Sequence, residues 1–375
     1  PGRDRGRQMS SETRAAGTSM MAREIAEQPA AIEHTLAALM PLRPDLRALM
    51  GDRRHVLLVA RGSSDNAAVY GRYLLETHTG VSAALAAPSV ATQYRRGRDL
   101  SDTLVVALSQ SGGTEEIVTT QRWARACGAP TVAITNQADS ALAHEADLAL
   151  VTRAGHEQAV PATKSYTTQL AALAVLATGL APDPSALDAE LLRTPEELSR
   201  LLAETRLVDA VDLLSGGGPT LAIGRGLVLG TALEVALKLE ETCLRPVRAL
   251  SYADLRHGPI AVVASGVTAV LLAAADGPLA DGLTGLAVDL RELGATVLGF
   301  GGDERFRSAC DVGVPGPRLP EPVAPLGLVL PPQLAVESLA RRLGLDPDAP
   351  RGLSKVTQTD RRRPTDPSEP TGGLQ

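Results

Sequence analysis

The chain has 375 residues, more than one simple core usually accommodates, so its length predicts two domains or one large core. It is 44% hydrophobic but only 2% aromatic, which is typical of helices that cover a parallel sheet with small side chains. A net charge of -6 provides no basic surface for nucleic acid, and no apolar stretch is long enough to span a membrane. Three cysteines without paired spacing indicate neither disulfides nor zinc, so we expect a cytoplasmic protein.

The N-terminal segment, residues 1–19, is Arg-rich and polar, and we expect it to be a flexible extension outside the fold. The first regular pattern begins with an apolar run at 55–60. It continues through the turn-forming residues 61–66 and then through a helical pattern that ends near Thr79. This pattern predicts a strand, a loop and a helix.

The same order recurs further along the chain. A strand at 104–108 leads into the loop 109–114 and a helix that ends near Cys127, and strands follow near 131–135 and 148–152. Strands that alternate with helices predict right-handed crossovers and a parallel sheet.

A second series repeats the first. The stretch TLAIGRG at 220–226 parallels VLLVARG at 56–62, and further strand candidates lie at 268–273, 296–300 and 311–314. This duplication predicts two tandem α/β domains, each a doubly wound, flavodoxin-like parallel sheet flanked by helices.

The boundary between the two series is marked by prolines. Three prolines among polar residues predict a linker at 182–195, and a helix from about 195 to 214 should open the second domain. The predicted division is a first domain over 20–190, a second over 195–345, a catalytic tail over 346–358 and a disordered end over 359–375.

The loop Ser109 to Thr114 follows a strand, at the sheet edge where helix N-termini offer N–H groups to anions. It carries the hydroxyls of Ser109, Ser111 and Thr114 and the amide of Gln110, and its two glycines allow close approach of the backbone. We therefore predict a phosphate site that needs no cationic side chain; the alternative is a plain helix N-cap. The matching loop of the second series, 274–278, has no hydroxyl. Neither loop has a nucleotide-binding motif, so no cofactor is expected.

Glu234, Lys238 and Glu241 are spaced i, i+4 and i+7 on the helix predicted over 227–243, which places two carboxylates and an ammonium on one stripe. An exposed salt bridge is the alternative interpretation. The apolar residues around the stripe favour partial burial and perturbed acid–base behaviour.

Lysine is rare in this chain and occurs only at positions 164, 238 and 355. Unlike arginine, lysine can lose its proton and form an imine with a carbonyl, so each is a candidate, with a surface role as the alternative. His257 lies in a Gly-Pro turn that can expose its imidazole; a structural turn residue is the alternative. The other five histidines lack metal-ligand spacing, and no metal is expected.

The chain resembles the tandem sugar isomerase (SIS) domain family, in particular the isomerase half of glutamine:fructose-6-phosphate amidotransferase, over nearly all of residues 20–359. The stretches that carry the resemblance are EIAEQP at 24–29, GSS at 62–64, SQSGGT at 109–114, TK at 163–164, TTQ at 167–169, ALEVALK at 232–238, HGP at 257–259 and the tail at 348–355.

The resemblance implies a role for each candidate residue. The matching phosphate-binding positions are Ser64, Ser109, Gln110, Ser111 and Thr114, and the sugar-contacting positions are Ser63 and Val160. Glu241 matches the base that moves a proton between C1 and C2, with Glu234 and Lys238 as its supporting pair. His257 matches the ring-opening group that one subunit of a homodimer contributes to the other. Lys355 matches the tail lysine that forms an imine with the open ketose.

Two departures from the family pattern narrow the expected reaction. No glutaminase domain is present in the sequence, so we do not expect glutamine to supply ammonia, and Ala162 stands where the family has a serine. The resemblance then implies a SIS-type glucosamine-6-phosphate deaminase that produces fructose 6-phosphate and ammonia. The alternatives are a fructosamine-6-phosphate deglycase, ammonia-dependent synthesis of glucosamine 6-phosphate, and a non-catalytic sugar-phosphate sensor.

The tail that carries Lys355 contains Pro347, Pro350 and Gly352, which predict a mobile, extended segment. We expect it to close over the pocket when substrate binds.

Overall fold

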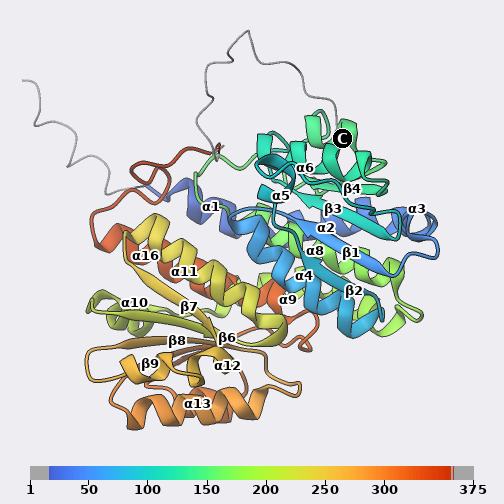
Figure 1. Cartoon of the computed structure of the whole chain (residues 1–375). Coiled ribbons are helices and arrows are strands. Elements are labelled where there is room, and N and C mark those ends of the chain that lie inside the picture. Colours follow the sequence, from blue (N-terminus) through green and yellow to red (C-terminus); the bar gives the residue numbers. More distant parts are fainter. Residues whose placement is uncertain (1–16, 356–357, 359–375) are drawn as a thin grey trace, which may run out of the picture.

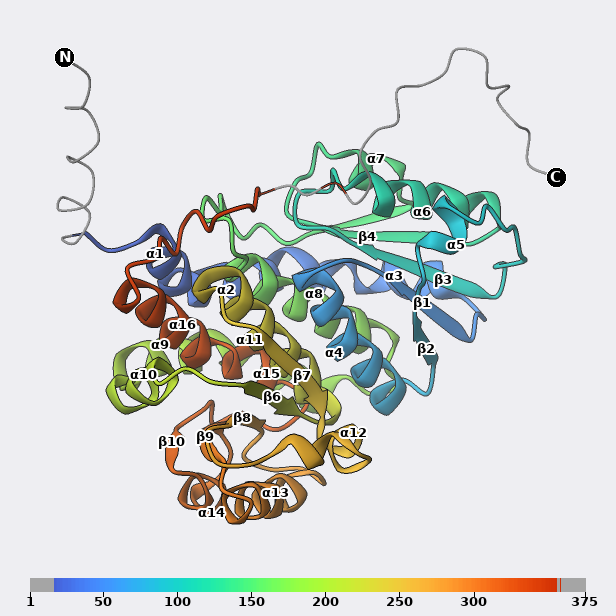
Figure 2. The same ribbon diagram turned by 60° about the vertical axis from the view of Figure 1, so that its left-hand side comes forward.

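A computed structural model of the chain describes residues 17–355 and residue 358. It contains two five-stranded sheets, in the strand orders β2-β1-β3-β4-β5 and β10-β9-β8-β6-β7, with helices around and between them (Figures 1 and 2). All neighbouring strands in both sheets are parallel. The predicted α/β class with parallel sheets is therefore confirmed.

The N-terminal half holds the first sheet. Its strands are β1 (His55–Val59), β2 (Ser82–Leu85), β3 (Thr103–Leu108), β4 (Thr131–Thr135) and β5 (Leu148–Val151). Its helices are α1 (Met20–Ala26), α2 (Gln28–Leu39), η1 (Met40–Leu42), α3 (Arg43–Met50), α4 (Ser63–His78), α5 (Ser89–Thr92), α6 (Glu115–Ala126), α7 (Ala141–Glu145) and α8 (Lys164–Leu180). Because β1 pairs with β2 on one side and β3 on the other, the strand order reverses there, which opens a crevice at the carboxyl ends of β1 and β3.

The C-terminal half holds the second sheet. Its strands are β6 (Thr220–Gly224), β7 (Val247–Ser251), β8 (Thr268–Ala273), β9 (Thr296–Gly301) and β10 (Val312–Val314). Its helices are α9 (Ser185–Glu204), α10 (Val208–Ser215), η2 (Gly226–Val228), α11 (Leu229–Cys243), α12 (Tyr252–Arg256), η3 (Pro259–Val262), α13 (Ala280–Glu292), α14 (Glu304–Ala309), α15 (Ala324–Leu328) and α16 (Leu330–Arg342).

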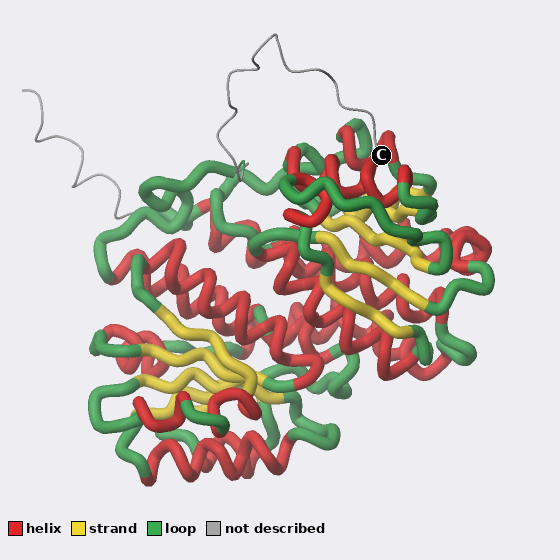
Figure 3. The backbone as a smooth tube through the Cα atoms, viewed as in Figure 1, coloured by secondary structure: helices red, strands yellow, loops and turns green. Residues whose placement is uncertain are grey.

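Helix α8 forms the centre of the core. Its residues from Lys164 to Gly179 are all buried, and it packs against α2, α3 and α4. One continuous buried cluster runs from the first sheet through α8 and α11 to the second sheet. Figure 3 shows the two blocks of strands with helices between them. The two sheets thus share one large core, with a smaller apolar cluster on the other face of the first sheet.

The segment predicted as a linker is a helix, and this prediction was wrong. Helix α9 runs through Pro195, and the single helix predicted over 195–214 is instead the end of α9 followed by α10. The reason is tertiary packing, because Leu187, Leu191, Leu198 and Leu201 form a buried stripe at helical spacing. Burial of this stripe outweighs the one backbone hydrogen bond that an interior proline removes.

The predicted ends of the chain are only partly visible. The extension expected over 1–19, apart from residues 17–19, and the disordered end expected over 359–375 lie outside the described residues. None of the helices that the structure describes combines the length and apolar character needed to cross a bilayer.

Candidate functional site

The candidate site lies where the strand order of the first sheet reverses. Helix α4 begins directly after β1 and the 61–62 turn, and α6 begins after β3 and the loop Ser109 to Thr114. Both helix N-termini therefore point toward the same crevice, where unpaired N–H groups favour an anion.

The loop Ser109 to Thr114 is held by its own side chains. The Ser109 and Thr114 hydroxyls lie 3.2 Å apart, and Ser111 Oγ accepts a hydrogen bond from Gly113 N at 3.2 Å. Gly112 has a φ of 61°, and a Cβ there would lie 2.1 Å from Ser140 Oγ, so only glycine fits. Thr114 is the N-cap residue of α6 but makes no side-chain cap bond, which argues against the plain N-cap interpretation.

This loop lines a cavity of about 410 Å³. The wall is formed by Arg61, Gly62, Ser64, Leu108, Ser109, Gln110, Ser111, Thr114, Ile117 and Lys355. Five predicted phosphate-binding residues and the tail lysine are therefore brought together from separate elements. Two cations from outside the loop also line the cavity. One of them, Arg61, pairs with Glu116 through two hydrogen bonds of 2.9 Å.

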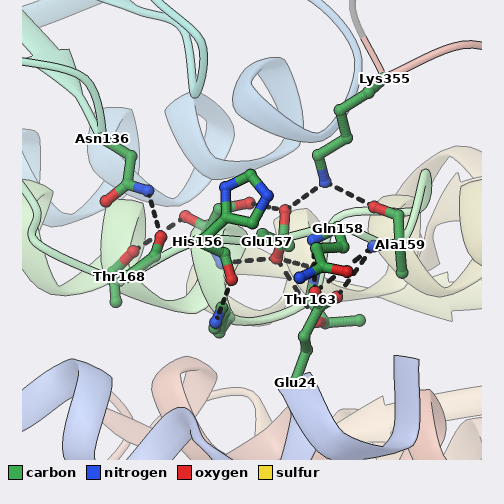
Figure 4. Close-up of polar contacts among 12 residues, drawn as sticks. Glu24, Asn136, His156, Glu157, Gln158, Ala159, Thr163, Thr168 and Lys355 are labelled. Carbon is green, nitrogen blue, oxygen red and sulfur yellow. Dashed lines mark hydrogen bonds and ion pairs between the residues drawn. The ribbon is translucent and has the colours of Figure 1, made fainter. Parts of the chain in front are cut away.

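Lys355 is held against the loop that joins β5 to α8. Its Nζ donates to Glu157 Oε2 and to the Ala159 carbonyl, both at 2.6 Å (Figure 4). Further back in the tail, the Asp348 carbonyl accepts from Val160 N at 2.8 Å, and the Asp348 carboxylate accepts from the N–H groups of Met20 and Met21. These contacts attach residues 348–355 at both ends in this structure, and closure of the tail when substrate binds stays a prediction.

Glu157 is a fully buried carboxylate that sequence reasoning missed. Burial alone would raise its pKa, but the Lys355 ammonium and hydrogen bonds from Ser165 outweigh burial and lower it. A neighbouring carboxylate, Glu24, accepts hydrogen bonds from Gln158 N and Ala159 N, and burial raises its pKa. The one local signal for Glu157 was its place after a strand of the first sheet, on the edge where the site lies.

Behind the first turn of α4 lies the charged stripe of α11. Lys238 contacts Glu241 and lies 3.5 Å from Glu234, and Lys238 and Glu234 are almost completely buried whereas the Glu241 side chain is 24% exposed. Asn66 Nδ2 donates to Glu234 at 2.9 Å, and Ser63 hydrogen-bonds the same carboxylate. The stripe is therefore buried against α4, as its apolar neighbours indicated.

Burial also sets the protonation of this stripe. Loss of solvent raises the pKa of Glu234, against the opposing effects of Lys238 and the hydrogen bond from Asn66. Burial by itself would lower the pKa of Lys238, but the charges of Glu234 and Glu241 raise it above its usual value. Glu157 adds to that effect, so the α11 stripe and the Lys355 contact are electrostatically linked.

Six of the predicted site residues do not line the cavity: Ser63, Val160, Glu234, Lys238, Glu241 and His257. His257 is exposed in the turn between α12 and η3, beside the second sheet, and does not line the cavity of its own chain. Val160 contributes its backbone N–H to the tail rather than a side chain to the cavity wall. Among the described residues, no three His, Cys, Asp or Glu side chains are grouped as metal ligands.

Similar proteins support one family. The SIS domain model matches residues 49–179. The glutamine–fructose-6-phosphate aminotransferase (isomerizing) of Symbiobacterium thermophilum is 36% identical over 357 residues, which cover 89% of this chain and 58% of that protein. The enzyme of the same name from Pyrococcus horikoshii is 32% identical, with 89% and 57% covered. The chain thus spans just over half the length of the curated relatives it matches.

Solved structures resemble the chain over its whole fold. A protein from Silicibacter pomeroyi DSS-3 named "putative phosphosugar isomerase" is 32% identical, with a TM-score of 0.80 and coverage of 88% of this chain and 100% of that one. The C-terminal domain of glucosamine-fructose-6-phosphate aminotransferase from Francisella tularensis is 26% identical, with a TM-score of 0.81 and coverage of 89% and 99%. Glucosamine-6-phosphate deaminase from Thermotoga maritima is 26% identical, with a TM-score of 0.73 and coverage of 91% and 100%. Sequence, fold and site geometry agree, and the chain belongs to the SIS domain family.

Proposed function

We propose that this protein converts glucosamine 6-phosphate to fructose 6-phosphate with release of ammonia. One observation carries the proposal: the hydroxyl-rich loop Ser109 to Thr114 and the Lys355 amine line a single cavity. Phosphate-binding donors and a carbonyl-reactive amine in one cavity suit a phosphorylated sugar in its open-chain form.

The loop provides the phosphate end of this site. Hydroxyl and backbone donors converge at the start of α6, where the helix dipole favours an anion. Arg61 adds positive charge to the same wall, although its guanidinium is already paired with Glu116. We assign the phosphate contacts to Ser64, Ser109, Gln110, Ser111 and Thr114, which line the cavity. Ser63 and Val160 lie outside the cavity wall in this structure, and their role as sugar contacts rests on the family resemblance alone.

The α11 stripe provides the acid and base. Glu241 is the more exposed of its two carboxylates and is therefore assigned as the base that removes the proton from C2 and returns it to C1. This shift turns the aldehyde at C1 into an alcohol and the amine at C2 into an imine. Lys238 contacts Glu241 and is itself held by Glu234, so this pair keeps the base in place.

Lys355 is assigned to the last stage. Its neutral amine adds to the C2 imine carbon and expels ammonia, which leaves an imine between Lys355 and the sugar. Water then adds to C2, the C2–N bond breaks, and the products are fructose 6-phosphate and the free lysine. The 26% identity to the Thermotoga maritima deaminase, over 91% of this chain, supports this direction.

A second candidate is the opposite direction, in which ammonia and fructose 6-phosphate form glucosamine 6-phosphate. The observation that favours it is the 36% identity to an isomerizing aminotransferase, higher than the identity to the deaminase. Both directions use the same groups.

The decisive experiment measures both products from purified protein. Glucosamine 6-phosphate should yield ammonia and fructose 6-phosphate in equal amounts, and a panel of fructosamine 6-phosphates should release no free amine. Product formation only from fructose 6-phosphate and ammonium would favour the second candidate. Turnover of the fructosamine panel alone would establish a deglycase, and binding of all these sugars without turnover would leave a sensor.

A further inference from the structure

The tail that carries Lys355 is attached at two points to one short loop. Near the start of the tail the Asp348 carbonyl accepts from Val160 N. At the end of residues 348–355, Lys355 Nζ donates to Glu157 and to the Ala159 carbonyl. Both contacts fall within residues 157–160. This short loop therefore determines where the amine lies relative to the cavity.

Glu157 is the rigid part of that attachment. Its Oε1 accepts from Thr163 N and Ser165 N, both at 3.0 Å, at the start of α8. Its Oε2 accepts from Ser165 Oγ and Lys355 Nζ, both at 2.6 Å. Because α8 is the most deeply buried helix of the core, a group fixed to its first turn has little freedom to move.

A second carboxylate fixes the loop from the opposite side. Figure 4 shows Glu24 reaching the loop from one side and Lys355 from the other. Glu24 accepts from the N–H groups of Gln158 and Ala159, so the peptide that presents the Ala159 carbonyl to Lys355 is held in one orientation. Two helices, α1 and α8, thus support the contact with the lysine.

Capping of α8 by itself does not account for a charge at position 157. A neutral amide could accept from Thr163 N and Ser165 N equally well, whereas burial of a carboxylate costs several kcal/mol unless a charged partner offsets it. The charged partner in contact with Glu157 is Lys355. The carboxylate is therefore explained by its contact with the tail rather than by the helix start.

We propose that Glu157 is a positioning residue that aims the Lys355 amine at C2 of the bound sugar. This inference rests on the proposed function, since it assumes that Lys355 is the group that forms the imine. Glu157 itself touches no substrate in this scheme and acts only through Lys355.

The test compares E157Q with the matched control E24Q. Both replace a buried carboxylate by an amide of the same shape and keep acceptors for the same loop and helix N–H groups. Only E157Q removes the carboxylate in direct contact with Lys355, whereas Glu24 acts on that lysine at longer range. Displacement of a reacting group by about 1 Å can cost on the order of 100-fold in rate. We therefore expect E157Q to lose roughly 100-fold in kcat with little change in KM, and E24Q to remain near wild type.

Lysine labelling measures the accessibility of the Lys355 amine, which would not change if Glu157 had only a structural role. The other two lysines, Lys164 and Lys238, are each only 2% exposed, so an amine-reactive reagent reports on Lys355 and the chain terminus. Without substrate, Lys355 should be labelled faster in E157Q than in wild type. Borohydride trapping of Lys355 with fructose 6-phosphate should be slower in E157Q, both at neutral pH and at about pH 9.5, close to the ordinary pKa of lysine.

The possible outcomes separate this inference from the proposed function. If wild type shows neither turnover nor a trapped Lys355, the proposed function fails. If wild type is active but E157Q matches it, or differs from it only at neutral pH, Glu157 does not position the amine. Equal losses in E157Q and E24Q would assign the effect to loop structure. Should E157Q not fold, E157D, which keeps the charge on a shorter side chain, should still slow trapping without changing KM.

Discussion

Lys238 is enclosed by the two carboxylates of its own helix and is almost fully buried with one of them, Glu234. Such an arrangement is favourable only if each charge keeps its partner, because an unpaired buried charge costs far more than an exposed one. Asn66 and Ser63 complete the set from α4. At the scale of single residues, the site is thus a group of charges that hold one another in defined positions.

The clearest residue-level prediction concerns Lys355. Arginine would preserve the positive charge near Glu157 but could not add to a carbonyl. We expect Lys355→Arg to lower kcat by at least about 100-fold with little change in phosphate affinity. Steady-state kinetics and peptide mapping after borohydride reduction would check this. Near-normal turnover in the variant would show that Lys355 contributes only a positive charge to the cavity wall.

Glu157 should also give folding stability a defined pH dependence. Its folded-state pKa lies below the usual value of 4.5, so its contribution is present above pH 4.5 and is lost as the pH falls through the lower folded value. E157Q lacks this contribution. We expect wild type to be more stable than E157Q by about 2 kcal/mol at pH 7, and the difference to narrow below pH 4.5. Urea denaturation at several pH values would measure it; a difference independent of pH would contradict the assignment.

At the scale of elements, the site depends on how closely α11 and α4 approach each other. A Cβ added at Gly230 would lie 2.4 Å from the Asn66 carbonyl oxygen and 3.3 Å from Tyr70 N, so the two backbones are in direct contact there. Glycine at this position lets Asn66 reach Glu234. The helix crossing therefore joins the charged stripe to the first turn of α4, whose Ser64 faces the cavity.

Substitution by alanine should have opposite effects on stability at two helical glycines, Gly230 inside this contact and Gly285 outside it. Gly230→Ala should force α11 away from α4 and destabilise the protein by about 1–3 kcal/mol, with a loss of activity as Asn66 leaves Glu234. Gly285→Ala, on the exposed side of α13 with nothing within 4 Å of the added Cβ, should be neutral or stabilising by up to about 1 kcal/mol. Denaturation curves for both variants would show whether the close approach or helix propensity governs the response.

At the scale of the whole molecule, two similar sheets carry different crevices. In the second sheet, the loop after β8 contains Asp276 and Gly277, and a Cβ at Gly277 would lie 2.4 Å from Glu321 Oε2. Asp276 Oδ1 accepts from Glu321 N at 2.7 Å, and burial together with Asp276 raises the pKa of the Glu321 carboxyl. Two acidic side chains thus occupy the position that corresponds to the phosphate loop.

The difference between the two crevices predicts one sugar phosphate per chain. The loop Ser109 to Thr114 offers converging donors, whereas Asp276 and Glu321 would repel an anion. Isothermal titration with fructose 6-phosphate should give a stoichiometry near one molecule per chain. The double substitution Ser111→Ala and Thr114→Ala should abolish this binding. Two sites of equal affinity would show that the acidic loop does not exclude phosphate.

His257 supplies the second prediction at this scale. It is exposed on its own chain and does not line the cavity there, which fits a role in the site of a second copy. We expect mixtures of His257→Ala and Glu241→Gln chains, each inactive alone, to recover part of the wild-type activity because mixed dimers would contain one intact site. Absence of recovery after demonstrated subunit exchange would place ring opening elsewhere.

Much of this protein was predictable from local sequence alone. The loop Ser109 to Thr114 and the stripe Glu234, Lys238 and Glu241 were identified correctly as elements because turn residues and helical spacing act over a few positions. The linker predicted at 182–195 was wrong because the prolines are a local signal, while the buried leucines of α9 depend on distant partners.

Only the tertiary structure decided which of these groups meet. Glu157 and Lys355 are 198 positions apart, and Asn66 and Glu234 are 168 apart, so no local pattern marks either pair. Their contacts exist because α11 packs against α4 within the shared core, and because the tail lies on the loop that leads into the buried helix α8. Periodicity and turn chemistry are short-range effects of the backbone, whereas the partner and burial of a charge depend on how whole helices pack.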